Sequence, residues 1–252
     1  MRHSHIGNGR LCRFVGSIYA EYAQYYLGRS YYESGSFTAA QTELAKVETN
    51  YPTSSLLAGA RYYLGRSYFD AGSFSAAIAP FQRVLLVTGT TFADNAQCYL
   101  GRSYYELGSF AEAEVELAKV ETDYPTSAYL ATARYYLGRS YFDDGAYADA
   151  IGPFQRVQTV TGTTYADNAR YYEGRCQYAL GALTDALAIF GDVLSTYPTS
   201  QYADNALYYE VRVYADQGNC SSATTALDQL NSQFPSSPEI SRAETYLSNA
   251  GC

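Results

Sequence analysis

The apolar positions of this chain recur in blocks that each predict a pair of helices. In one block, a first helix is expected over Ser54–Asp70 and Gly72 follows it. The next stretch places Ala77, Phe81 and Val84 at spacings of four and three, which puts them on one face of a second helix. A glycine in the left-handed region commonly ends a helix, so the glycine marks the turn between the two. Glycine recurs at this point in every block, as Gly35, Gly72, Gly108, Gly145, Gly181 and Gly218.

The blocks share the string YYLGRSY or a degraded copy of it. Copies begin at residues 25, 62, 98, 135, 171 and 208, so they are 36 or 37 residues apart. A fixed period of this length is typical of stacked supersecondary units. The units are 25–61, 62–97, 98–134, 135–170, 171–207 and 208–244. Units one and three share one ending and units two and four another, so 25–97 and 98–170 form a longer repeat.

Pairs of turn residues are expected to end the second helices. Tyr-Pro does so at 51–52, 124–125 and 197–198, and Thr-Gly at 88–89 and 161–162. Proline stops a helix, and the serine or threonine after it is expected to cap the next one. Pro80 and Pro153 are expected near the starts of their own helices, where a missing N–H costs little.

The repeated residues closely resemble the tetratricopeptide repeat. The Leu-Gly pair of that family, with Tyr three residues after the Gly, is present as Leu27-Gly28-Tyr31, Leu64-Gly65-Tyr68, Leu100-Gly101-Tyr104 and Leu137-Gly138-Tyr141. Its later small, apolar and proline positions are matched by Ala40, Leu44, Val47 and Pro52, and by Ala113, Leu117, Val120 and Pro125. The early Trp of the family is absent, with Gln24, Arg61, Gln97 and Arg134 in its place, and the units exceed the usual 34 residues.

The resemblance implies an all-α fold, a right-handed superhelical α-solenoid of about six helix-turn-helix units plus a C-terminal capping helix. One domain is expected over 17–250, after an irregular segment 1–16, with the cap at 239–250. The long units and their YPTS and ADNA joints are similar to those of bacterial envelope members, such as the Tol–Pal system coordinator and the outer-membrane assembly lipoproteins.

The amino-acid composition limits the classes of partner and the compartments that are expected. The net charge of −8 disfavours nucleic acid, because neutralising phosphates requires a basic face. The 29 tyrosines, with only Lys46 and Lys119 as lysines, favour an extracellular, periplasmic or cell-envelope protein. No apolar run reaches transmembrane length, and the N-terminal residues lack a recognisable signal peptide.

Catalytic chemistry is not expected. The only histidines, His3 and His5, lie in the irregular N-terminal segment, where a polar tail is favoured over a metal site. No phosphate-binding glycine loop or nucleophile motif is present, so neither an enzyme nor a cofactor is predicted.

The recurring surface chemistry is an arginine ladder flanked by aromatic residues. One arginine follows the Gly, or its equivalent, in each unit, and an acid comes one helical turn later in five units. By the resemblance, this face lines the concave groove of the solenoid. The candidate binding residues there are Tyr25, Arg29, Tyr62, Arg66, Arg102, Tyr135, Arg139, Arg175 and Arg212. They could grip a peptide, carboxylate or glycan. Alternatively, each arginine pairs with nearby acids and only stabilises the stack of helices. The presence of an acid at the same position in five units favours this alternative.

The two ends differ. The cap carries apolar residues on one face and polar residues on the other, as a terminal repeat requires. At the other end the array begins mid-repeat, so Ile18, Tyr19 and Tyr22 lack a preceding helix and are candidates for end-to-end assembly. Residues 1–16 or another molecule would cover them.

Five cysteines leave at least one unpaired within the chain. Cys220 and Cys252 are the expected disulfide, because the start of the last second helix and the end of the antiparallel cap should lie close together. Cys98 and Cys176 are expected to be buried thiols, and Cys12 is the candidate for an intermolecular bond.

The sequence therefore predicts a non-enzymatic scaffold for protein–protein interaction, of which an envelope adaptor that docks a partner segment in its groove is one form. One alternative is a structural subunit, with or without glycans, that assembles end to end into an extracellular filament or array. The other is a glycan-binding solenoid.

Overall fold

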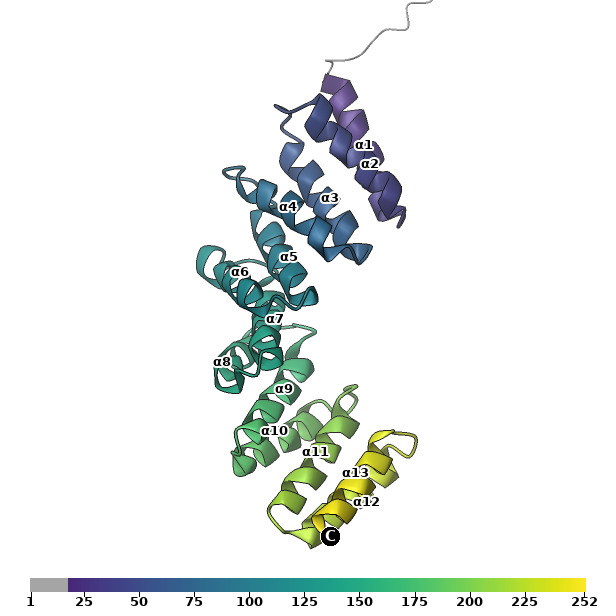
Figure 1. Cartoon of the computed structure of the whole chain (residues 1–252), viewed down its shortest axis with the longest axis vertical. Coiled ribbons are helices and arrows are strands. Elements are labelled where there is room, and N and C mark those ends of the chain that lie inside the picture. The colour runs from purple at the N-terminus through teal and green to yellow at the C-terminus, as the bar shows by residue number, and fades with distance from the viewer. Residues whose placement is uncertain (1–17) are drawn as a thin grey trace, which may run out of the picture. The chain divides into compact units, whose positions relative to one another are not determined.

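The computed structural model describes residues 18–252, and this part of the chain is all-α, with thirteen helices and no strand. The helices follow one another as six pairs and a final helix (Figure 1). The first helices are α1 Ile18–Glu33, α3 Leu57–Asp70, α5 Ala93–Glu106, α7 Leu130–Asp143, α9 Ala166–Ala179 and α11 Ala203–Asp216. The second helices are α2 Phe37–Asn50, α4 Phe74–Leu85, α6 Phe110–Asp123, α8 Tyr147–Val157, α10 Leu183–Thr196 and α12 Cys220–Gln233. The final helix, α13, spans Glu239–Ala250.

Each pair turns at the glycine that the sequence marks. Gly72 has φ of 74°, a left-handed conformation that glycine adopts without a steric penalty. Its N–H donates to the carbonyl of Phe69 at 2.9 Å, and the Ser73 N–H donates to the carbonyl of Tyr68 at 2.8 Å. These bonds satisfy carbonyls at the helix end that would otherwise lack a partner. All six predicted turn glycines have positive φ, so this prediction is confirmed.

The Leu-Gly pair of the repeat lets the two helices of a pair approach closely. A Cβ built on Gly65 would lie 2.6 Å from the Phe81 ring, and one on Gly28 would lie 2.6 Å from Leu44. Phe81 and Leu44 are almost fully buried, so neither has free space into which it could move. The glycine is therefore required by packing, and the sequence prediction of paired helices in a solenoid is confirmed.

Residues up to Ala96 and residues from Gln97 onward form two compact units. In the second unit, the first helices lie against one another: α7 contacts α9, and α9 contacts α11. Side chains from successive first helices therefore come together on one face, which we call the first-helix face.

Two local expectations were wrong. The serine after Tyr-Pro is not the helix cap: Ser54 accepts a bond from the Leu56 N–H at 3.1 Å, two residues along the chain, and α3 begins only at Leu57. Such a bond forms a serine turn that leads the chain into the helix. Pro80 and Pro153 lie in the middle of α4 and α8, not near their starts, because these helices begin at Phe74 and Tyr147. Both prolines are buried there.

Candidate functional site

The arginines that follow the repeat glycine line up on the first-helix face. In the unit from Gln97 onward they are Arg102, Arg139, Arg175 and Arg212, which we call the arginine row. Each belongs to a different first helix, and successive first helices contact one another from α7 to α11. Arg29 and Arg66 hold the same position on α1 and α3 of the other unit.

Aromatic rings from adjacent first helices lie between the arginines. The guanidinium of Arg139 lies 4.3 Å from the ring centre of Tyr172 on the following helix. Arg175 lies 4.5 Å from Phe142 on the preceding helix and 5.7 Å from Tyr209 on the following one. A cation over an aromatic face gains about 0.5–2 kcal/mol, more where water is excluded. The row therefore joins the helices and holds each guanidinium in a fixed orientation.

A Tyr–Asp–Arg group surrounds Arg139 of the row. In it, Tyr105 donates its hydroxyl proton to Asp143 at 2.7 Å, and Arg139 is ion-paired with the same carboxylate at 3.0 Å. Burial, followed by the hydrogen bond to Asp143, raises the pKa of the Tyr105 hydroxyl, which therefore remains a donor at neutral pH. The same three groups meet in the compact unit that ends at Ala96, as Tyr32, Asp70 and Arg66. In these groups the arginine charge is compensated within the protein.

Arg175 departs from this pattern. The position one turn after it is Ala179, where the other units carry an acid, and the ring before it is Phe142, which has no hydroxyl. Within the described residues, no ion pair is found for Arg175, whose surroundings are the rings of Phe142, Tyr171, Tyr172 and Tyr209. An arginine cannot lose its proton in a protein, so this guanidinium is a fixed positive charge without a carboxylate beside it.

The tyrosines predicted as binding platforms are buried. Tyr25, Tyr62 and Tyr135 are 4–5% exposed. The hydroxyls of the last two accept a bond from Arg66 at 3.1 Å and from Arg139 at 3.3 Å. These rings position the arginines and are not available to stack against a ligand such as a sugar.

Sequence reasoning missed the second tyrosine of each Tyr-Tyr pair. Tyr63 lies over Arg29 at 5.1 Å, and Tyr136 over Arg102 at 4.6 Å, in each case from the following first helix. The recurrence of the doublet was a signal of its importance. Spacing along one helix does not reveal a contact between two repeats, however, so the role of this tyrosine required the packed structure.

The predicted assembly residues lie at the start of α1. Tyr19 is 79% exposed and Tyr22 is 39% exposed. The same helix exposes Tyr26, Leu27 and Tyr31, which makes it the main cluster of exposed large apolar side chains in the described residues. The side chain of Ile18, Cys12 and residues 1–16 with their two histidines fall outside the described part of the chain.

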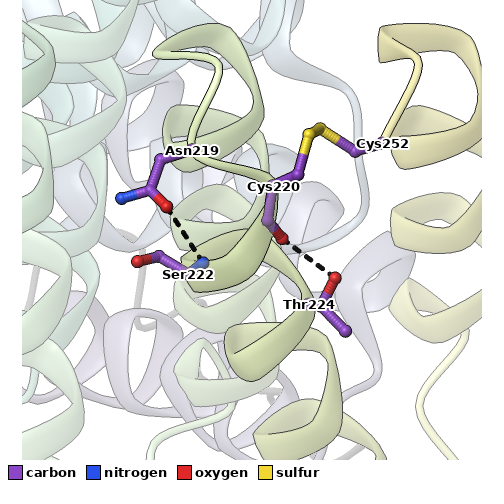
Figure 2. Close-up of a disulfide and its surroundings, with 5 residues drawn as sticks. All are labelled: Asn219, Cys220, Ser222, Thr224 and Cys252. Atoms are coloured by element: carbon purple, nitrogen blue, oxygen red, sulfur yellow. Dashed lines mark hydrogen bonds between the residues drawn. A yellow bond between two sulfur atoms is a disulfide. The ribbon is translucent and has the colours of Figure 1, made fainter.

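A disulfide fixes the C-terminal end. Cys220, the first residue of α12, is bonded to Cys252, the pair expected from the sequence (Figure 2). Next to it, the Asn219 side chain accepts a bond from the Ser222 N–H at 3.1 Å and caps α12. The disulfide therefore ties the beginning of α12 to Cys252, two residues beyond the end of α13. Cys98 and Cys176 are buried free thiols, and burial raises the pKa of Cys176 to about 12.

No group of three or more potential metal-ligating side chains is found among residues 18–252. Nor does any helix of this part combine the length and the apolar character needed to cross a membrane.

Comparison with known proteins places these features in a family. Tetratricopeptide repeat models match residues 25–90, 100–164 and 168–200. A search of curated proteins finds no match. Among solved structures, the C-terminal part of a repeat-containing protein from Cytophaga hutchinsonii is 18% identical with a TM-score of 0.71, over 88% of this chain and 87% of that one. PilF of Pseudomonas aeruginosa is also 18% identical, with a TM-score of 0.63 over 90% and 97% of the two chains.

A third similar structure is YrrB, described as a repeat protein with an unusual peptide-binding site. It is 19% identical, with a TM-score of 0.63 over 80% of this chain and 97% of that one. At these identities, the similarity to solved structures concerns the fold alone.

Proposed function

This chain belongs to the tetratricopeptide repeat family, whose members are scaffolds for protein–protein interaction, and we propose that its arginine row docks an acidic segment of a partner protein. The observation that carries the proposal is Arg175. Its positive charge lies on the first-helix face without a carboxylate of this chain, whereas Arg139 in the same row has Asp143.

The surroundings of Arg175 define the chemistry of the partner. A guanidinium pairs best with a carboxylate, which accepts two parallel hydrogen bonds from it. The rings of Phe142 and Tyr209 flank the site, so apolar or aromatic side chains next to the acid would have surfaces to pack against. An Asp or Glu between apolar residues is therefore the expected core of the docking segment. Because the scaffold as a whole is negatively charged, an acidic segment would be attracted by the guanidinium of Arg175 itself and not by the net charge of the protein.

Selection from a random peptide library on the immobilised protein tests the proposal. We expect selected peptides to contain an acid with apolar neighbours. Arg175→Gln should weaken their binding by about 10–100-fold, which corresponds to the loss of one hydrogen bond to a charged group. Lys119→Gln is the control, because it removes one positive charge from a partly exposed ion pair on α6. Equal weakening by both variants would mean that general charge, and not the row, attracts the peptide.

The exposed face of α1 favours a second candidate function, contact with another copy of this chain. Tyr63 shows how the repeat normally buries this position: it packs against Tyr25 and Tyr32 of the preceding first helix. Tyr26 is its equivalent on α1 and is 49% exposed. A large exposed apolar surface commonly marks an interaction site.

Sedimentation velocity over a concentration series tests self-association. Tyr19→Ser with Tyr22→Ser should shift the equilibrium toward the monomer. Leu180→Ser, which removes another exposed apolar side chain directly after α9, should not. A wild-type protein that stays monomeric at high concentration would eliminate this candidate.

We also propose that the protein works in an oxidising compartment, as an extracellular, periplasmic or envelope scaffold. The disulfide between Cys220 and Cys252 supports this location, because structural disulfides persist mainly outside the reducing cytosol. Fractionation of the source cells, with thiol labelling before lysis, tests it: these two cysteines should resist labelling.

A further inference from the structure

Two units carry a glutamate where the repeat has a buried leucine. Leu64, Leu100 and Leu137 fill this position in three of the units and are at most 5% exposed. In the last two units the equivalent residues are Glu173 and Glu210. A carboxylate at a buried packing position is costly unless donors surround it.

Glu173 has the donors that it needs. Arg170, three residues earlier on α9, is ion-paired with it at 2.8 Å. Gln155, on the preceding second helix α8, donates its amide N–H to the other carboxylate oxygen at 2.9 Å. The Glu173 carboxylate is therefore satisfied within the protein although the residue is only 2% exposed.

Glu210 lacks both of these donors. The residue equivalent to Arg170 is Leu207, and the residue equivalent to Gln155 is Gly191. Within the described residues, no hydrogen bond or ion pair to the Glu210 carboxylate is found. A Cβ added to Gly191 would lie 3.7 Å from Oε1 of Glu210, so the carboxylate faces the space that a side chain would otherwise fill. Burial raises the pKa of this carboxyl to about 7.

A pocket of about 240 Å³ opens beside Glu210. Oxygen-bearing side chains on α11 and α12 line it: Tyr214, Ser222, Thr225 and Gln229. The Thr225 hydroxyl donates to the Ser221 carbonyl at 3.0 Å, so its lone pairs remain to accept a bond from a ligand. The lining therefore combines one carboxylate with several neutral acceptors.

This donor set fits a small organic cation. A primary ammonium has three N–H donors and no acceptor, which matches one carboxylate and neighbouring hydroxyl or amide oxygens. A divalent cation such as Ca²⁺ takes six to eight oxygen ligands, usually several of them carboxylates, and only one carboxylate lines this pocket. The negative charge of Glu210 disfavours anions.

We propose that the Glu210 pocket binds a single primary ammonium group, held by a carboxylate that lacks the donors which Arg170 and Gln155 supply to Glu173. The pocket is lined by α11 and α12, with Gly191 of α10 close to the carboxylate, and it uses none of the arginine row. It therefore does not depend on the docking function proposed above.

The test follows the side-chain carboxyl ¹³C signal of Glu210 during titration with ethylammonium chloride, with sodium chloride at equal ionic strength as the reference. We expect a saturable shift at pH 8. Glu210→Gln, which identifies the signal, should weaken binding by about 10–100-fold when binding is followed through the signals of Ser222 and Thr225. A second titration with N-acetyl-lysine methylamide, which carries the same ammonium on a peptide unit, distinguishes a protein side chain from a free amine as the source.

Gly191→Gln is the sharpest control. It supplies an internal amide donor at the position of Gln155 and should reduce ethylammonium affinity without removing Glu210. Binding should also be about tenfold weaker at pH 6 than at pH 8, because the ligand must then displace the proton from a carboxyl with a pKa of about 7. The other titratable group in the pocket lining is Tyr214, and burial alone accounts for the raised pKa of Glu210.

A response equal to that of sodium chloride would overturn the proposal. So would an ethylammonium affinity that is the same in Glu210→Gln as in the wild type. Glu210→Leu places the usual repeat residue at this position, so its failure to bind would not be a consequence of misfolding.

Discussion

Replacing Glu210 with leucine should stabilise the protein, and increasingly so as the pH rises to neutrality. Burial raises the pKa of this carboxyl from 4.5 to about 7. The folded state therefore retains a proton that the unfolded chain releases between these two values. Because the folded-state pKa is the raised one, the stability associated with Glu210 is complete below about pH 4.5 and is lost as the pH rises to about 7.

The size of the effect follows from the pKa difference. Each pH unit corresponds to about 1.4 kcal/mol, so a pKa raised by about 2.5 costs the folded state about 3 kcal/mol once Glu210 is ionised. Leucine carries no charge, and it is the residue that other units bury at this place. The variant therefore loses this pH-dependent cost and retains the packing of the repeat.

Urea denaturation at a series of pH values measures the effect. The difference in unfolding free energy between Glu210→Leu and the wild type should grow by about 3 kcal/mol between pH 4.5 and 7.5, and then level off. Glu210→Gln should show the same pH dependence, because it removes the titration with little change in shape. A difference that stays constant over this range would refute the view that the partly buried Glu210 carboxylate lacks donors.

Three further predictions follow from the packing and can be measured by the same denaturation. Gly138→Ala should lower the free energy of unfolding by about 1–3 kcal/mol, because its Cβ would lie 2.7 Å from the buried Phe154 ring. Gly152→Ala on the adjacent helix meets only the flexible end of Arg156 at 3.2 Å and should be neutral or stabilising. Cys220→Ser should cost about 2–4 kcal/mol, since the disulfide closes a loop with a sequence separation of 32, and a reductant should then have no additional effect. Tyr105→Phe should cost about 1 kcal/mol by removing the hydrogen bond to Asp143, whereas a loss above 3 kcal/mol would imply a larger rearrangement of the row.

The repeat string predicted most of the fold because each of its residues has a local role. Gly72 was recognisable as a turn from its position after the apolar residues of the first helix, whereas the close approach at Gly65 became visible only in the structure. The prediction that Pro80 lies near a helix start was wrong because it relied on the usual preference of proline for the first turn. Helix α4 instead begins at Phe74, directly after the glycine turn. Buried packing around this proline overrides its usual preference for a helix end.

The site was less predictable because it depends on contacts between repeats. Spacing along one helix correctly put Arg139 and Asp143 one turn apart. It did not show that Tyr172 of the next helix covers the guanidinium, nor that Tyr135 is buried beneath it. Glu210 was visible in the sequence as a departure from leucine, but its lack of donors became clear only by comparison with the contacts of Glu173.

The central claim is that Arg175 offers an uncompensated positive charge to a partner, and Ala179→Glu tests it most directly. This substitution restores the acid that other units carry one turn after the arginine. Binding of a selected acidic peptide, measured by fluorescence anisotropy, should weaken by about 10–100-fold, because the new carboxylate occupies the guanidinium. Ala111→Glu adds the same charge to an exposed position on α6 and should leave binding unchanged. Equal peptide affinity in Ala179→Glu and the wild type would contradict the account.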